Sequence, residues 1–188
     1  MLKLYMVLLG CKPKARFTEQ HDIYFDVGYS LKDLVTGIIN SWPEAPKIHI
    51  DAWREVTEVE GYAIKVIEKT PSLERAPQQP EKLFFLNLGG YKKDEFEEYH
   101  YKILAVGKEK SAAIRQAKES TFYKHTGFTG ANSHIDDKYG VDVDDLYEIE
   151  DIIPAAIKEK YTLHILPRAA AGKDEWHLGY TILSKLLE

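Results

Sequence analysis

The apolar positions of the first seventy residues follow several spacings, and each spacing predicts one kind of element. An uninterrupted apolar run at 4–9 ends at a glycine, as a buried strand does, and 22–27 alternates like a second strand. Between 31 and 42 the apolar residues recur every three or four positions, which predicts an amphipathic helix. Segments 49–53 and 62–67 supply at least one more strand. The first seventy residues therefore predict the order strand, strand, helix, strand.

The same pattern returns in the second half of the chain. Lys3 matches Lys82, 79 positions later, and the match runs without a gap to Gly28 and Gly107. Ten of these 26 aligned pairs are identical, whereas unrelated segments would share about two. A tandem duplication explains the match. It also explains the apolar N-terminus, because an internal copy of the same run at 82–90 makes that run a core strand rather than an export signal.

A second block of identity follows the predicted helix. His49-Ile50-Asp51 matches His134-Ile135-Asp136 at a spacing of 85, so copy two is expected to carry six additional residues in the helix or the loop after it. We therefore expect an α+β protein in which two tandem strand-strand-helix-strand repeats pack about a pseudo-twofold axis into a single domain with mainly antiparallel sheet. The expected segments are copy one at 1–69, a proline-rich linker at 70–81, copy two at 82–153 and a C-terminal tail at 154–188 that packs on the core.

Composition and charge argue against several classes of function. With 44% hydrophobic residues among 188, the chain can form a packed core, and its net charge of -5 offers no basic surface for nucleic acid. No apolar stretch approaches the length of a membrane span, about 18 residues or more. Cys11 is the only cysteine, so no internal disulfide is expected and a reducing cytoplasm is the expected compartment. Its thiol is either a reactive nucleophile or, more simply, a small packed apolar group.

Five short motifs carry a resemblance to a known family, and the resemblance covers residues 1 to about 153. The motifs are TEQHD at 18–22, HIDAW at 49–53, LGGY at 88–91, EEYHY at 97–101 and HIDDKYGVDVDD at 134–145. Together they resemble the uncharacterised bacterial family filed as domain of unknown function 1543. The resemblance implies one or two copies of a common unit. It implies no activity and assigns no catalytic or binding residue.

Histidines and carboxylates recur in pairs spaced two residues apart. In a strand, residues i and i+2 leave on the same face, so each pair presents both side chains together. One Glu, one Asp and two His suit a divalent metal such as zinc, manganese or iron, or acid/base chemistry in a cleft. The alternative is a set of His–carboxylate hydrogen bonds that tie strand ends together without a ligand, so metal and cofactor stay open. The candidate ligand-binding residues are Glu19, His21, His49 and Asp51 in copy one, and Glu98, His100, His134 and Asp136 in copy two.

A weaker candidate is the turn expected after the first strand of each copy. Gly10 and Gly89 are each followed four residues later by a lysine, and copy one adds an arginine. A glycine turn with a lysine can hold a phosphate or carboxylate through backbone N–H groups and one charge. The Gly-Lys-Ser/Thr of a P-loop is missing, however, and an ordinary solvated turn is the competing interpretation. The candidate anion-binding residues are Lys14, Arg16 and Lys93.

An acidic stretch covers residues 136–151. It fails the spacing of an EF-hand calcium loop, because Lys138 and Gly140 fall where oxygen ligands belong. We interpret the stretch as a solvated acidic loop that could form a docking surface for a basic partner.

Three hypotheses for function follow, and whether the protein is an enzyme stays open because no linear motif of a known catalytic class occurs. The first is a cytoplasmic module that binds a small molecule or a protein. The second is a small metal-dependent or acid/base enzyme that uses the repeated His and carboxylate residues. The third is a structural or regulatory protein that docks through the acidic loop. We expect no nucleic-acid or membrane partner, and either a monomer with pseudo-dimer symmetry or a homodimer.

Overall fold

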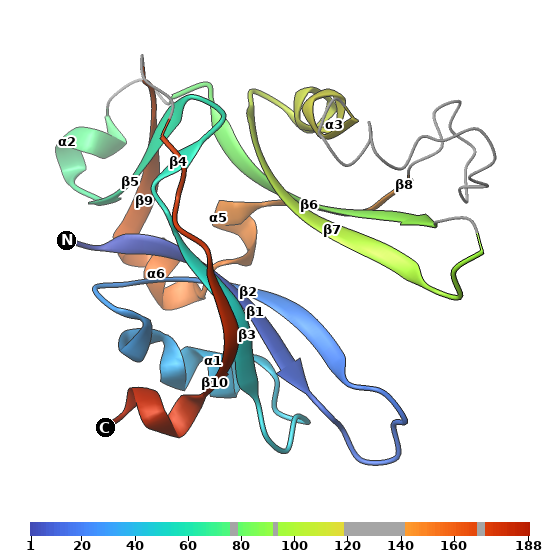
Figure 1. Cartoon of the computed structure of the whole chain (residues 1–188). Helices are drawn as coiled ribbons and strands as arrows, with labels where there is room; N and C mark the ends of the chain where they lie inside the picture. The colour runs from blue at the N-terminus through green and yellow to red at the C-terminus, as the bar shows by residue number, and fades with distance from the viewer. Residues whose placement is uncertain (76–78, 92–93, 119–141, 169–171) are drawn as a thin grey trace. The chain divides into compact units, whose positions relative to one another are not determined.

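The computed structural model describes residues 1–75, 79–91, 94–118, 142–168 and 172–188 (Figure 1). The chain divides into two compact units. Unit 1 combines Met1–Pro77 with Ile152–Glu188, and unit 2 is Gln78–Asp151.

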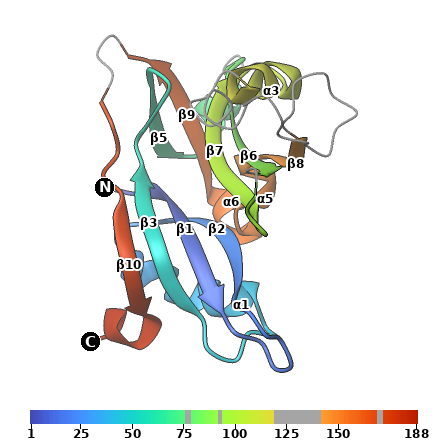
Figure 2. The ribbon, with the colours of Figure 1, turned by 45° about the vertical axis from the view of Figure 1, so that its right-hand side comes forward.

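The main sheet of unit 1 has four strands in the order β10-β3-β1-β2, and all neighbours are antiparallel. The strands β1 and β2 form a hairpin in which Lys3 lies opposite Gly28 and Cys11 opposite Gln20. A β-bulge interrupts the β1–β3 ladder between Leu8 and Leu9. The strands, which lie side by side in Figures 1 and 2, are β1 (Lys3–Cys11), β2 (Gln20–Gly28), β3 (His49–Val56) and β10 (His177–Ile182).

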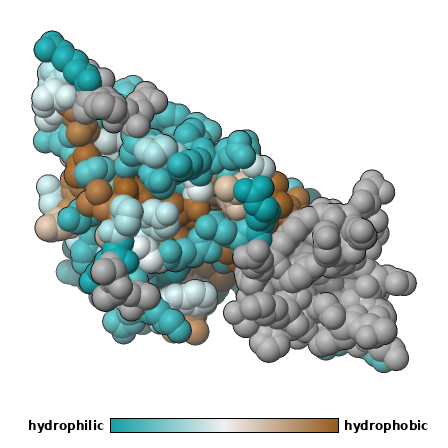
Figure 3. Space-filling view, turned by 90° about the horizontal axis from the view of Figure 1, so that it is seen from above, coloured by the Kyte–Doolittle hydropathy of each residue, from teal (hydrophilic) through white to brown (hydrophobic). Residues whose placement is uncertain are grey.

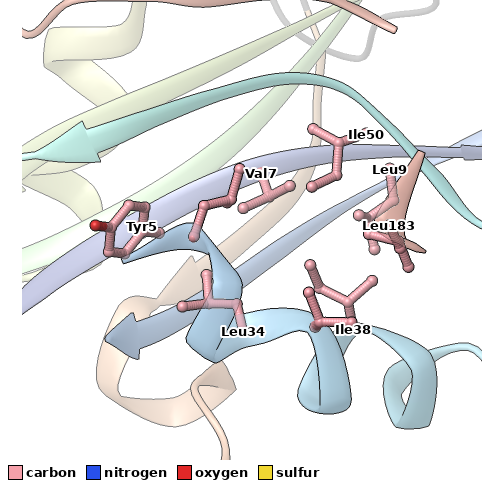
Figure 4. Packing of buried hydrophobic residues seen from close by; sticks show 9 residues of the cluster. Tyr5, Val7, Leu9, Leu34, Ile38, Ile50 and Leu183 are labelled. Atoms are coloured by element: carbon pink, nitrogen blue, oxygen red, sulfur yellow. The ribbon is translucent and has the colours of Figure 1, made fainter. Parts of the chain in front are cut away.

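A short helical segment packs its apolar stripe on one face of this sheet. It consists of the 3-10 helix η1 (Leu31–Leu34) and the helix α1 (Val35–Ser41). The Asp33 carboxylate accepts the Tyr29 and Ser30 N–H groups and so satisfies donors at the helix start. The helix predicted from the apolar spacing is thus present. The side chains that meet in this core are Tyr5, Val7, Leu9 and Ile50 of the sheet, Leu34 and Ile38 of the helical segment, and Leu183 (Figure 4).

The rest of unit 1 comprises a smaller antiparallel sheet, β4-β5-β9, and several short helical segments, of which η2 packs its Leu183 in the core of the main sheet. The C-terminal tail takes part in both sheets of the unit, because β9 pairs with β5 and β10 pairs with β3. The expected linker contains a helical turn, which starts with Thr70 as its cap and Pro71 in the first helical position. The elements are β4 (Glu58–Val59), β5 (Tyr62–Glu68), α2 (Pro71–Glu74), α6 (Ala155–Lys160), β9 (Tyr161–Pro167) and the 3-10 helix η2 (Leu183–Leu186).

Unit 2 is a three-stranded antiparallel sheet in the order β7-β6-β8. Its hairpin has the register of the first, with Lys82 opposite Gly107 and Gly89 opposite His100. The helix α3 packs on the sheet through Ala113 and Ala117. The elements are β6 (Lys82–Tyr91), β7 (Glu98–Gly107), α3 (Lys110–Lys118), β8 (Asp142–Glu148) and α5 (Ile149–Ile152).

The strand ladders correct the predicted alignment of the two copies after the helix. In unit 1 Gly10 lies opposite His49, and in unit 2 Gly89 lies opposite Asp142. The counterpart of His49 is therefore Asp142, 93 positions later, and not His134 at a spacing of 85. The same bulge occurs at equivalent places in both ladders, between Leu8 and Leu9 and between Asn87 and Leu88. Two residues are equivalent when they hold the same place in the backbone ladder. The recurrence of His-Ile-Asp at 134–136 does not establish such an equivalence.

The predicted α+β class with mainly antiparallel sheet is confirmed, whereas the pseudo-twofold packing of two copies into a single domain stays a prediction. In the part of the chain that is described, no helix is both long and apolar enough to cross a membrane. Apolar residues appear among the hydrophilic ones at the surface in Figure 3. The most exposed large ones include the hairpin residues Phe17 and Phe96, and Trp176, Leu178 and Tyr180 of the tail.

Candidate functional site

A cross-strand row of three residues forms the floor of the candidate site in unit 1. Gly10 lies in the central strand β1, opposite His21 of β2 on one side and His49 of β3 on the other. The glycine is needed for space. A Cβ built on Gly10 would overlap Nε2 of His49 and lie 2.5 Å from Oδ2 of Asp51. The missing side chain therefore leaves a cradle into which the neighbouring polar groups project.

The β-bulge brings Asp51 to the same place. Leu8 pairs with Ala52 and Leu9 pairs with Ile50, so Asp51 is the additional residue on β3. A bulge bends its strand and redirects side chains, and here the Asp51 carboxylate lies beside His49. Glu19 reaches the cluster from the residue just before β2. The two segments that flank β1 in the sheet thus supply the four side chains, Glu19 and His21 from the β2 side and His49 and Asp51 from β3.

The four side chains form a ring in which each imidazole faces both carboxylates. Nε2 of His21 lies 3.3 Å from Oδ2 of Asp51 and 3.7 Å from Oε2 of Glu19. Nε2 of His49 lies 3.2 Å from Oε1 of Glu19 and 3.3 Å from Oδ1 of Asp51. The predicted set Glu19, His21, His49 and Asp51 therefore meets in space.

The ring has a buried side and an open side. The side chain of His49 is 7% exposed and that of Asp51 is 25% exposed, while those of Glu19 and His21 are 43% and 44% exposed. Tyr180 of the edge strand β10 covers the His49 ring, with 4.3 Å between the ring centroids. Solvent and solutes can reach the cluster from the side of Glu19 and His21.

Two buried polar atoms of the cluster make no hydrogen bond. They are Nε2 of His49 and Oδ2 of Asp51. For His49 this holds although two carboxylate oxygens lie within 3.3 Å, because the atoms are not aligned for a hydrogen bond. Buried polar atoms are almost always paired, so an exception calls for a specific explanation.

Cys11 lies in the same strand and takes no part in the ring. It is buried and free. Burial raises the pKa of its thiol, and the nearby Glu19 carboxylate adds to the rise. A thiol that stays protonated is a poor nucleophile, so these observations favour the packed apolar group over the reactive cysteine.

Unit 2 holds a related cluster over Gly89. Nε2 of His100 lies 3.4 Å from Oδ2 of Asp144 and 3.8 Å from Oε2 of Glu98. A Cβ on Gly89 would lie 2.6 Å from Oδ2 of Asp144. The side chains of His100, Glu98 and Asp144 are between 29% and 41% exposed. Glu98 and His100 therefore take the places of Glu19 and His21, as the hairpin match predicts.

Asp144 is the site residue that the sequence alignment missed. The ladders make it the counterpart of Asp51, and its distance to His100 repeats the distance from Asp51 to His21. The predicted partners His134 and Asp136 lie outside the described residues. One signal was available in the sequence: the alternation Asp142-Val143-Asp144 has the polar-apolar-polar pattern of His49-Ile50-Asp51.

The predicted anion site differs from the prediction in one respect. Gly10 belongs to β1 and forms part of the floor under the ring, so it is not part of a turn. Lys14 and Arg16 are exposed in the connection between β1 and β2, near Ala15 with its positive φ of 64°. Lys93 lies outside the described residues. Anion binding by these side chains stays a prediction.

The acidic stretch is also different from the predicted solvated loop where it is described. Residues 142–148 form β8, the edge strand of the unit 2 sheet, and α5 follows directly. Several of its acidic side chains have partners within the unit. Glu148 binds Lys82 at 2.8 Å, and Asp144 faces His100. These contacts reduce the number of carboxylates available to a basic partner.

Comparisons with known proteins agree with the fold and leave the activity open. Residues 16–66 match the model of a family described as Domain of Unknown Function (DUF1543). That range includes all four residues of the Gly10 ring, and the family's presence as a second copy at 82–153 stays a prediction. No curated protein matches the chain by sequence. The crystal structure of the protein Il1583 from Idiomarina loihiensis is similar, with a TM-score of 0.56 and 22% identity over 97% of this chain and 98% of that one. At this identity the likeness shows the fold alone.

Proposed function

We propose that unit 1 binds a divalent transition-metal ion through Glu19, His21, His49 and Asp51. One observation carries the proposal: Nε2 of His49 is buried over Gly10, faces two carboxylates and has no hydrogen-bond partner. A metal ion would satisfy this nitrogen and the unpaired Oδ2 of Asp51 together.

The chemistry of the four groups supports zinc or a similar ion. Imidazole nitrogens and carboxylate oxygens are standard zinc ligands, with bonds of about 2.0–2.2 Å. In a tetrahedron with such bonds, neighbouring ligand atoms are separated by about 3.4 Å. The His–carboxylate distances in the ring run from 3.2 to 3.7 Å. The competing network of hydrogen bonds would align donors with acceptors, and His49 lacks this alignment.

Binding would require some movement of the exposed pair. Within the described part of the chain, no group of three or more His, Cys, Asp or Glu side chains is already arranged to hold a metal ion. His49 is buried and has little freedom, whereas Glu19 and His21 are more than two-fifths exposed. The proposal therefore includes a rotation of these two side chains toward the buried pair.

The open side of the ring favours metal-dependent catalysis as a second candidate function. Structural zinc sites are closed, whereas catalytic sites keep a position for water or substrate. A bound ion beside Glu19 and His21 would be accessible from solvent, and it could polarise a substrate carbonyl or phosphoryl oxygen or activate a water molecule.

The test is a zinc titration of the full chain after removal of metal with a chelator. Calorimetry of the wild type should give a tight site that is lost, or weakened at least tenfold, in His49→Ala and in Asp51→Asn. Asp22→Asn is the matched control, because Asp22 is exposed on β2 next to His21 and accepts only its neighbour's N–H among the hydrogen bonds described. It should bind zinc like the wild type. Equal zinc affinity in all four proteins, or no binding to the wild type, would overturn the proposal.

A further inference from the structure

We infer that unit 2 carries a second divalent-cation site over Gly89, and that this site accepts a harder cation such as Mn²⁺ more readily than the Gly10 site does. Its ligands are Glu98, His100 and Asp144, with Asp142 at the register position of His49. The inference rests on the proposed function of unit 1, because it extends the same arrangement to a different ligand set.

The geometry of the two clusters is the same wherever both are described. His100 lies 3.4 and 3.8 Å from its two carboxylate partners, and His21 lies 3.3 and 3.7 Å from the equivalent atoms. Both glycines are buried in the central strand, and both leave a cradle that a Cβ would fill with a clash against the aspartate. In both units the glycine leaves room for the aspartate carboxylate beside the histidine, so an imidazole and a carboxylate meet over the glycine in each.

A second pair of contacts supports the register on which the assignment of Asp142 depends. Lys3 binds Glu55 at 2.5 Å in unit 1, and Lys82 binds Glu148 at 2.8 Å in unit 2. The lysines are equivalent in the hairpin ladder, and the glutamates are equivalent in the other ladder at the spacing of 93 that relates His49 to Asp142. The equivalent ion pairs of the two units thus agree with the backbone pairing.

The difference at one register position predicts a difference in metal preference. The Gly10 ring has two imidazoles and two carboxylates, whereas the Gly89 set has one imidazole and two carboxylates, those of Glu98 and Asp144. Imidazole suits zinc, and carboxylate oxygens suit Mn²⁺, Mg²⁺ and Ca²⁺. Zinc still binds most such sites more tightly than manganese does. The expected change is therefore a smaller ratio of zinc to manganese affinity at the Gly89 site.

The experiment loads the metal-free full chain with one equivalent of zinc and then titrates Mn²⁺, with free Mn²⁺ measured by electron paramagnetic resonance. The wild type should bind one Mn²⁺ per chain. Asp144→Asn should weaken this binding at least tenfold, while Glu97→Gln, a change of the exposed neighbour of Glu98, should leave it unaltered. Far-ultraviolet circular dichroism and a thermal melt establish that Asp144→Asn is folded.

The outcomes separate this inference from the proposed function. Failure of wild type to bind Mn²⁺ while it binds zinc through Asp51 would overturn the second site and leave the first. Mn²⁺ binding that is the same in Asp144→Asn and wild type would also overturn it. Loss of Mn²⁺ binding in Asp144→Asn, together with zinc binding that is indifferent to Asp51, would support the second site and count against the first.

Discussion

The two units use one backbone arrangement to hold two different sets of side chains. Each has three antiparallel strands in the same order, a bulge at the same place in the ladder and a buried glycine opposite a histidine. The residue on the other side of the glycine is His49 in unit 1 and Asp142 in unit 2. The backbone brings polar groups together over the glycine in both units, and the residue at this register position differs between the units.

The cores under the two sheets differ in the size of their helix residues. The helix of unit 1 presents Leu34 and Ile38, and the equivalent positions of unit 2, 79 residues later, are Ala113 and Ala117. The sheet positions change much less, because Phe84 replaces Tyr5 with a side chain of nearly the same size and Leu86 is one methylene larger than Val7. The close packing of unit 1 therefore depends on its larger helix residues.

The largest effect should come from giving unit 1 the small helix residue of unit 2. Leu34 is fully buried, so Leu34→Ala removes packed methyl groups and leaves a cavity. The free energy of unfolding should fall by about 3 kcal/mol, within the usual range for such changes. Urea denaturation measures it, with the exposed helix position Thr36→Ala as control. A loss no larger than the control's would mean that the core of unit 1 relaxes around the gap.

The next effect tests the register position directly. His49→Asp should leave unit 1 with one imidazole, as at the Gly89 site, and it introduces the residue type that unit 2 has at the same register position. Zinc affinity should fall at least tenfold, about 1.4 kcal/mol, and Mn²⁺ affinity should fall less. Calorimetry with both ions measures the ratio. An equal loss for zinc and manganese would show that the histidine does not set the preference.

The hairpins were predictable from sequence because their match is long and has no gap. Ten identities at one spacing locate Gly10 with His21 and Gly89 with His100, and the ladders reproduce these pairs. The spacing of two residues places His49 and Asp51 on one face of a strand, but their meeting with Glu19 and His21 depends on the pairing of β1 with β3 and on the bulge at Asp51. The identity of the unit 2 residue that corresponds to Asp51 likewise depends on the hydrogen bonds between β6 and β8 and on the bulge in that ladder. The recurrence of His-Ile-Asp at 134–136 gives no information about this pairing. The pairing of β9 with β5 and of β10 with β3 was not predictable either, because the tail has no repeat partner in the sequence.

A smaller effect is expected in the pH dependence of stability, to which the core of unit 1 contributes and the core of unit 2 does not. Tyr24 donates to Oδ2 of Asp26, and the Val27 N–H donates to Oδ1, within the core of unit 1. The equivalent positions of unit 2 are Ile103 and Ala105, which do not titrate.

Burial raises the pKa of Asp26, although the Tyr24 and Val27 hydrogen bonds oppose the rise. The folded state therefore favours the protonated carboxyl. Its contribution to stability is complete below the unfolded pKa, near 4, and is lost as the pH rises through the higher folded value. Asp26→Asn should flatten this part of the stability profile, measured by urea denaturation from pH 3 to pH 7. A profile that is unchanged in the variant would assign the slope to other groups.

The smallest effect should come from the contact that is the same in both units, the ion pair at the end of the central strand. Lys82 and Glu148 are 47% and 18% exposed in unit 2, and Lys3 and Glu55 are similarly accessible in unit 1. Exposed pairs contribute about 0.2–1 kcal/mol and are screened by salt, so Glu148→Gln and Glu55→Gln should each lower the free energy of unfolding by about 0.5 kcal/mol or less. The hydrogen bond and charge of Glu148 raise the pKa of Lys82, so its contribution is present below the ordinary lysine pKa and disappears as the pH rises above it. Denaturation at low and high salt measures both variants. A loss well above 1 kcal/mol in either variant, or a loss that is the same at low and high salt, would contradict the description of these contacts as exposed, screened pairs.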